Sequence, residues 1–196
     1  TPALKNYIGN LTNTINEDDL LSIRKNYIKS LMDLNVSEKI ITDKMPVNFR
    51  MIGLILTAIP EAKIIHLTRN PKATCWSNYK HYFANENGFT FDQEDLARFF
   101  ILYQELMGFW HKSFPNKIYD ISYERLTTHQ EDETQKLLKY CELDWDNNCL
   151  NFHKNTRAVH TASASQVRQK MYQGSSDAWK KYEKFLQPLI MGLNQT

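Results

Sequence analysis

Residues 63–83 read KIIHLTRNPKATCWSNYKHYF and contain a strand, a turn and the start of a helix in immediate succession. The first six residues, 63–68, are largely apolar and β-branched, which predicts a short buried strand. Asn70 then predicts a helix N-cap, and Pro71 predicts the first turn of that helix. A strand that leads directly into a helix is the repeating unit of folds in which parallel strands are covered by helices.

The junction between this strand and this helix is suited to an anion. Unpaired N–H groups and the helix dipole favour a phosphate at a helix N-terminus. Arg69, at the end of the predicted strand, adds a guanidinium that can donate two hydrogen bonds to a phosphate. Ser77 lies eight residues later and offers a hydroxyl from the second turn of the helix. Each residue alone is more often structural, but together they predict a bound phosphate.

The rest of the chain repeats this alternation of strands and helices. The predicted elements are a helix capped at residues 16–19 that continues to Leu34, a strand at 39–42, a helix at about 48–59, a long helix from about 91 to 114, a strand at 117–123, a helix around 132–141 and a last helix near 176–193. This order predicts an α/β fold with a parallel β-sheet flanked by helices on both faces. No linker interrupts residues 1–196, so a single domain is expected.

Three residues fall at or just beyond the ends of the predicted strands, where ligands bind in parallel sheets. They are Lys44, Arg69 and Tyr123. Because parallel strands end at the same edge, these side chains predict one site. A fixed cation such as Lys44 could stabilise negative charge that develops during a reaction. A solvated loop lysine is an equally good explanation of Lys44 alone.

The composition describes an ordinary globular chain, with 42% hydrophobic and 23% charged residues among 196 and a net charge of +2. This charge gives no reason to expect nucleic acid or a membrane surface as a partner. Three cysteines, an odd number, argue against a disulfide framework and favour a reducing, cytoplasmic setting. The six histidines show no His-x-His or His-x-x-x-His pairing, so no metal site is expected, and His66 is expected to be packed or at a sheet edge.

Residues 63–83 resemble the 3′-phosphate-binding segment of sulfotransferases, the enzymes that use 3′-phosphoadenosine 5′-phosphosulfate. This resemblance implies that Arg69 and Ser77 hold the 3′-phosphate of that donor. Residues 43–46 (DKMP) are similar to the Lys-x-Pro element of tyrosylprotein sulfotransferases. That similarity implies that Lys44 contacts the bridging oxygen of the departing sulfate group.

Two further blocks extend the resemblance over residues 39–189. Residues 123–126 (YERL) match the Tyr-Glu-x-Leu element of the family, which implies that Tyr123 lies against the adenine, although a tyrosine at the rim of the core is the alternative. Residues 161–183 look like the C-terminal block of bacterial sulfotransferases joined to tetratricopeptide repeats. The resemblance implies that Ser163 helps to hold the transferring sulfonate or the 5′-phosphate, and that Gly174 contacts the 3′-phosphate. Trp179 is expected to be a core anchor.

One part of the family pattern is missing. Sulfotransferases begin with a strand and a Pro-Arg-Ser-Gly-Thr-Thr-type loop, whose backbone amides hold the 5′-phosphosulfate much as a P-loop does. No such loop occurs in residues 1–196, and Ala178 stands where relatives usually have Arg or Lys. We therefore expect an N-terminally incomplete P-loop-like sulfotransferase fold, the C-terminal two-thirds of the domain, with the first strand, the loop and the catalytic base upstream of Thr1.

The resemblance implies a transferase that moves a sulfonate group from 3′-phosphoadenosine 5′-phosphosulfate to a hydroxyl or amine acceptor, without a metal. Lys44 and Ser163 would be catalytic, and Arg69, Ser77, Tyr123 and Gly174 would bind the nucleotide. Two alternatives stay open: a nucleotide or nucleoside kinase of related architecture, and a non-catalytic nucleotide-binding domain. The acceptor and the oligomeric state are not readable from the residues.

Overall fold

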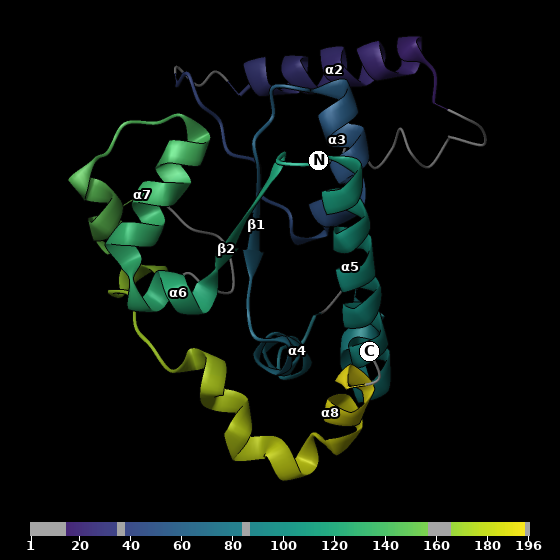
Figure 1. Ribbon diagram of the computed structural model, residues 1–196, viewed down its shortest axis with the longest axis vertical. Helices are drawn as coiled ribbons and strands as arrows, with labels where there is room; N and C mark the ends of the chain where they lie inside the picture. Colours follow the sequence, from purple (N-terminus) through teal and green to yellow (C-terminus); the bar gives the residue numbers. More distant parts are fainter. Residues whose placement is uncertain (1–14, 35–37, 84–86, 157–165, 195–196) are drawn as a thin grey trace.

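A parallel pair of strands lies at the centre of the molecule. The computed structural model describes residues 15–34, 38–83, 87–156 and 166–194. β1 (Ile64–Thr68) pairs with β2 (Ile118–Ser122) in a register that runs from Ile64 opposite Ile118 to Thr68 opposite Ser122. Figure 1 shows α6 (Tyr123–Thr128) and α7 (Gln130–Cys141) on one side of the pair, and α3 (Ile52–Ala58) and α5 (Gln93–Ser113) on the other. The predicted α/β class with a parallel sheet is confirmed.

The strand–helix junction forms at the residues that predict it. β1 ends at Thr68, and α4 (Pro71–Tyr79) begins three residues later. The side chain of Asn70 accepts a hydrogen bond of 3.0 Å from the Ala73 N–H, so Asn70 is the N-cap. Pro71 occupies the first helical position, where a missing N–H costs nothing. This short connection holds Arg69 between the strand end and the helix start.

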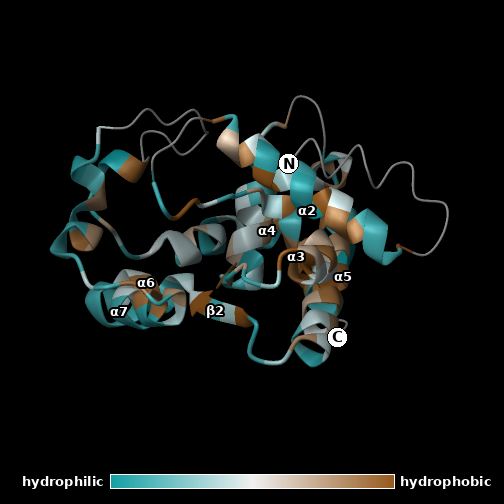
Figure 2. Cartoon of the chain, turned by 90° about the horizontal axis from the view of Figure 1, so that it is seen from above, coloured by the Kyte–Doolittle hydropathy of each residue, from teal (hydrophilic) through white to brown (hydrophobic). Residues whose placement is uncertain are grey.

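Two buried clusters stabilise the fold, and α5 contributes to both. Near its N-terminus, Leu96 and Phe100 pack with α4 and α8 (Gln187–Leu193). Farther along, Met107 packs with α3 and with Ile118 of β2. Trp179 is only 6% exposed and belongs to the first cluster, so its predicted role as a core anchor is confirmed. Figure 2 colours much of α3 and α5 brown, whereas α7 is largely teal, in keeping with this division between core and surface.

A glycine allows α3 to approach α5 closely. A Cβ atom on Gly53 would lie 2.6 Å from the ring of Trp110, well inside van der Waals contact. The Trp110 indole N–H donates a 2.8 Å hydrogen bond to the carbonyl of Phe49, just before α3. The indole therefore fits against the start of α3 only because residue 53 has no side chain.

The prediction of a strand at residues 39–42 is wrong. This segment carries no strand in the structure, and the sheet formed by the described residues has two members, β1 and β2. Ile40 and Ile41 are 56% and 41% exposed. A strand gains its hydrogen bonds from a neighbour, and residues 38–45 have no strand beside them among the described residues, so they extend without joining the sheet.

Two predicted helices are divided in the structure. Residues 46–58 form a 3₁₀ turn, η1 (Pro46–Met51), followed by α3. The last helix is a 3₁₀ segment, η5 (Ser175–Phe185), followed by α8, whose first turn contains Pro188 and cannot donate there to the preceding turn. The other described helices are α2 (Glu17–Met32), η2 (Gly88–Phe91), η3 (Asn147–Lys154) and η4 (Gln166–Arg168). Within the described residues, none of the helices combines the length and the apolar character needed to cross a bilayer.

Candidate functional site

A groove of about 1360 Å³ opens between the extended segment 38–45 and β1. Lys44, Arg69 and Ser77 all line it, so the structure brings three of the sequence-predicted residues to one space. Lys44 is exposed on the segment, two residues before the proline that begins η1. Arg69 stands at the carboxyl end of β1, and Ser77 lies on α4. A cation on each side of a groove is an arrangement suited to an anionic ligand.

Arg69 is held in place by the segment that begins η5. Its Nη2 donates a 2.8 Å hydrogen bond to the carbonyl of Ser175, and its Nε donates a 3.3 Å bond to the hydroxyl of Ser176. The guanidinium carbon lies 4.8 Å from the centre of the Tyr123 ring, within the range of a cation–π contact. These contacts fix the direction of the guanidinium, and they use two of its five donors.

Tyr123 and Gly174 reach the site through these same serines. The Tyr123 hydroxyl lies 2.7 Å from the Ser175 hydroxyl, and Gly174 immediately precedes Ser175 as the N-cap of η5. Gly174 has a φ of +90°, a conformation that residues with a side chain rarely adopt. The turn at Gly174 therefore delivers Ser175 and Ser176 to Arg69.

Glu124 is a central residue of the site that the sequence analysis did not single out. Its carboxylate accepts hydrogen bonds from the Asn70 N–H at 3.0 Å, the Ser176 hydroxyl at 2.6 Å and the Ser122 hydroxyl at 3.3 Å. Burial alone would raise the pKa of Glu124, but these hydrogen bonds outweigh it and hold the pKa below its usual value. The carboxylate thus joins the end of β2 to the start of α4 and to η5. The sequence signal that could have identified Glu124 was its position in the Tyr-Glu-x-Leu element, next to Tyr123.

We refer to Arg69, Tyr123, Glu124, Ser175 and Ser176 as the Arg69 cluster. Two of the N–H donors at the start of α4, which were predicted to bind an anion, already bond to side chains of the protein. The Asn70 N–H binds Glu124, and the Ala73 N–H binds the side chain of the N-cap.

Ser163, the other predicted catalytic residue, lies outside the described residues.

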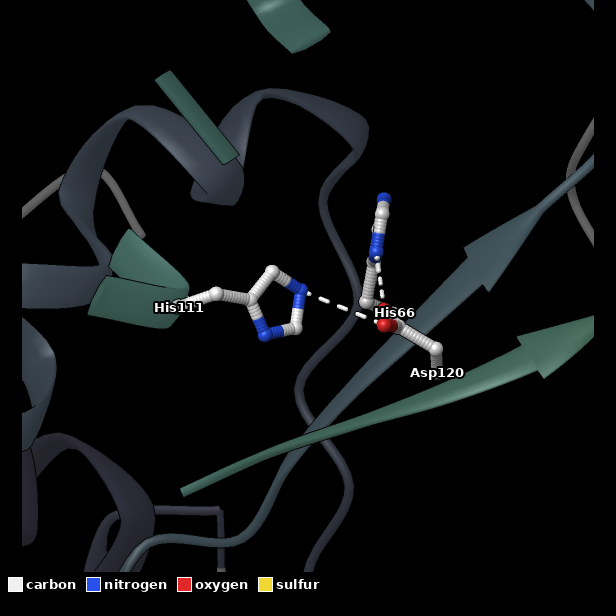
Figure 3. A group of neighbouring side chains, drawn as sticks. All are labelled: His66, His111 and Asp120. Carbon is white, nitrogen blue, oxygen red and sulfur yellow. Dashed lines mark hydrogen bonds and ion pairs between the residues drawn. The ribbon is translucent and has the colours of Figure 1, made fainter. Parts of the chain in front are cut away.

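A second polar group lies on the face of the sheet that is turned toward α5 (Figure 3). His66 Nδ1 is 2.6 Å from Asp120 Oδ1, and His111 Nε2 is 3.2 Å from Asp120 Oδ2. The other ring nitrogen of His66 contacts the Tyr103 hydroxyl. His66 is packed in its strand, as expected. The spacing of these residues in the chain gave no sign of their meeting, because 54 positions separate His66 from Asp120.

The three cysteines are free in the structure, and Cys75 is fully buried. Burial raises the pKa of the Cys75 thiol to about 12. The thiol therefore stays protonated near neutral pH, and only the thiolate is a nucleophile. Cys75 packs in the core and takes no part in the groove chemistry.

Comparisons with known proteins bear on the family and the fold of the chain. A model described as the sulfotransferase family matches residues 11–147. The chain is 40% identical over 174 residues to an uncharacterized protein of Aquifex aeolicus (strain VF5). The match covers 87% of this chain and 23% of that protein, so the chain spans less than a quarter of that relative's length. It is also similar to the solved sulfotransferase domain from the curacin biosynthetic pathway, with a TM-score of 0.58 and 18% identity over 81% of this chain and 60% of that chain. At this identity the structural likeness concerns the fold.

Proposed function

This chain belongs to the sulfotransferase family, and on that premise we propose that it moves a sulfonate group from 3′-phosphoadenosine 5′-phosphosulfate to a hydroxyl or amine acceptor. The bond between sulfur and the phosphate oxygen breaks as the acceptor atom bonds to sulfur, and the acceptor proton passes to a base. No residue described above is assigned as this base, which the family resemblance puts upstream of Thr1. Positioning and fixed charge supply most of the rate in such transfers.

The observation that carries the proposal is the placement of Arg69, which stands at the carboxyl end of β1, on the wall of the groove, beside the start of α4. Arg69 and Ser77 bind the 3′-phosphate in this proposal, and Gly174 immediately precedes Ser175, whose carbonyl accepts a hydrogen bond from Arg69. Arg69 has donors left for a phosphate beyond those that bind Ser175 and Ser176. Tyr123, already stacked on the guanidinium, extends this surface toward the adenine.

Lys44 has the catalytic role. Its ammonium neutralises charge on the phosphate oxygen that loses the sulfonate, from across the groove. Ser163 is assigned to the sulfonate or the 5′-phosphate by resemblance alone. The proposal needs no metal for the transfer. The free cysteines are in keeping with a cytoplasmic setting.

We also propose that the groove receives a strand and a phosphosulfate loop from a longer form of the protein. β1 has a strand on one side only among the described residues. Ile65 and Leu67 on its outer face are 46% and 54% exposed, and Ile41 faces the same groove from the extended segment. Apolar residues on both walls and a free strand edge suit an added strand, which would lead its loop toward Lys44 and Arg69.

The test is a calorimetric titration with 3′-phosphoadenosine 5′-phosphate, with 5′-AMP and magnesium–ATP as controls. It is run on this chain and on a form extended at its N-terminus. We expect binding that depends on the 3′-phosphate and is tighter in the longer form. Release of 3′-phosphoadenosine 5′-phosphate from the sulfate donor, measured over a panel of hydroxyl and amine acceptors, then identifies the acceptor.

Other outcomes contradict the proposal in distinct ways. Tighter binding of magnesium–ATP than of the 3′-phosphorylated nucleotide would indicate a kinase. Nucleotide binding by the longer form without turnover on any acceptor would indicate a non-catalytic nucleotide-binding domain. Absence of binding in both forms would remove the nucleotide site altogether.

A further inference from the structure

We propose that His66, His111 and Asp120 form a binding site for one divalent transition-metal ion of the zinc class. These residues lie on β1, α5 and β2, and their side chains point toward one another (Figure 3). The proposal does not rest on the sulfotransferase activity, because none of the three belongs to the Arg69 cluster.

The distances are close to those that a metal ion requires. One ligand atom from each residue lies within 4.8 Å of the other two. Asp120 Oδ1 is 2.6 Å from His66 Nδ1, and Asp120 Oδ2 is 3.2 Å from His111 Nε2. Metal–ligand bonds of about 2.0–2.2 Å in a tetrahedral site separate ligand atoms by about 3.3–3.6 Å. Small side-chain movements therefore suffice to admit an ion.

The ligands are mounted on ordered elements. His66 and Asp120 are direct partners in the register of the parallel strands, on the same face of the sheet. His111 comes from α5, one turn beyond Met107, which is 4% exposed and anchors the helix in the core. An ion held by these three side chains would join both strands to the long helix.

Tyr103 orients His66 for this role. Its hydroxyl contacts His66 Nε2, which leaves Nδ1 directed toward Asp120. Metal-binding histidines usually donate their second ring N–H to an oxygen, which fixes the tautomer. The Tyr103 hydroxyl oxygen is placed to accept the Nε2–H of a metal-bound His66.

The donor set and the access route indicate the class of ion. Two imidazoles and one carboxylate suit zinc, cobalt or nickel better than magnesium or calcium, which prefer oxygen ligands. All three residues line the groove, and their side chains are 14%, 37% and 49% exposed for His66, His111 and Asp120. In this chain an ion can enter from the groove, and water can complete its coordination.

The experiment uses Co²⁺ as a spectroscopic probe and Zn²⁺ as its competitor, with the metal-free chain at pH 7.5. We expect one equivalent of Co²⁺ to give visible absorption bands of a four- or five-coordinate ion, which Zn²⁺ then abolishes. Zn²⁺ should also raise the melting temperature, because it binds only the folded state. His111→Ala should weaken Zn²⁺ binding at least 10-fold and abolish the Zn²⁺-dependent rise in melting temperature.

Two variants keep the result interpretable. Asp120→Asn preserves the volume and a hydrogen-bonding group, and it should also weaken Zn²⁺ at least 10-fold. His81→Ala removes an exposed histidine outside the cluster and should leave Zn²⁺ binding unchanged. The proposal is overturned if the wild-type chain binds Zn²⁺ no more tightly than His111→Ala, since the three residues then form a hydrogen-bonded network only. Equal weakening by His81→Ala would overturn it as well.

Discussion

The guanidinium of Arg69 links three parts of the chain that are distant in sequence. It bonds to Ser175 and Ser176, stacks on Tyr123 and faces the groove. Arg69→Ala should weaken binding of 3′-phosphoadenosine 5′-phosphate roughly 10- to 150-fold, which corresponds to about 1.5–3 kcal/mol for charge-assisted hydrogen bonds. Calorimetric titration measures this change. Arg69→Lys should recover only part of the affinity, because an ammonium lacks the planar fork of donors.

The matched control for this prediction is Arg98→Ala. Arg98 lies on α5 with a side chain that is 71% exposed, and it pairs only loosely with Asp95 at 3.3 Å. Its removal changes the net charge of the chain by the same amount. Equal loss of nucleotide affinity in both variants would mean that overall charge, and not the Arg69 site, governs binding.

Glu133 couples stability to pH. Its side chain is 7% exposed and bonds to Arg125 at 2.7 Å and Lys136 at 2.8 Å. The hydrogen bond from Arg125, followed by that from Lys136, lowers the pKa of Glu133 to about 2. An unfolded glutamate titrates near about 4.3. Because the folded pKa is the lower one, the stabilisation is complete above the unfolded pKa and is lost as the pH falls from about 4.3 toward 2.

Glu133→Gln should therefore lower the free energy of unfolding by roughly 1–2 kcal/mol at pH 7, the scale of lost charge-assisted hydrogen bonds. The difference from wild type should shrink as the pH falls toward 2. Denaturant titrations at several pH values measure it. Asp132→Asn, at the adjacent exposed position on α7, is the control. A difference that does not change between pH 7 and pH 2.5 would contradict the assignment.

At the scale of elements, the contact between α3 and α5 depends on a missing side chain. Gly53→Ala would place a methyl group 2.6 Å from the Trp110 ring. Although alanine is the better helix former, we expect this variant to lose about 1–3 kcal/mol, the usual effect of overpacking. Thermal or denaturant unfolding measures the change.

Gly108→Ala provides the matched comparison in the same pair of helices. A Cβ at this position in α5 meets no atom within 4 Å. The substitution should therefore raise stability by about 0.5–1 kcal/mol through the loss of backbone freedom in the unfolded chain. Opposite signs for the two variants are the expected result. Stabilisation by both would show that α3 can move away from Trp110 at little cost.

The elements also explain which predictions held. The junction at residues 63–83 could be predicted because its signals are local: apolar β-branched residues, then Asn70 and Pro71. The absence of a strand at residues 39–42 could not be predicted. These residues have strand character, but a strand forms only beside a neighbouring strand, and that neighbour is not encoded locally. The α/β class survived this error because it follows from the order of the elements.

The candidate site was predictable only in its separate pieces. Arg69 and Lys44 were marked by residue type and by position near predicted strand ends, and Ser77 by its spacing from Arg69; all three line one groove. The role of Glu124 and the meeting of His66 with His111 depend on three-dimensional packing. Periodicity and spacing carry no information on such contacts.

At the scale of the whole molecule, the free edge of β1 is the feature that a longer form of the protein should alter. If an added strand enters the groove, the β1 amides that point away from β2 gain partners. Hydrogen exchange should then slow at these amides by at least 10-fold in the extended form relative to this chain, while exchange in α7 changes little. Unchanged exchange along β1 would contradict the proposal that the groove receives a strand.

The hydrogen bonds that hold Arg69 also have a consequence for the order of folding. They join residues 106 and 107 positions apart, whereas the paired residues His66 and Asp120 on the two strands are 54 positions apart. Closing a longer loop costs more entropy, and distant contacts slow folding. During synthesis the two strands can pair before Ser175 and Ser176 have left the ribosome. We therefore expect a nascent chain to form its sheet before its Arg69 cluster, and an arrest of translation before residue 175 to leave Arg69 without its bonds to Ser175 and Ser176.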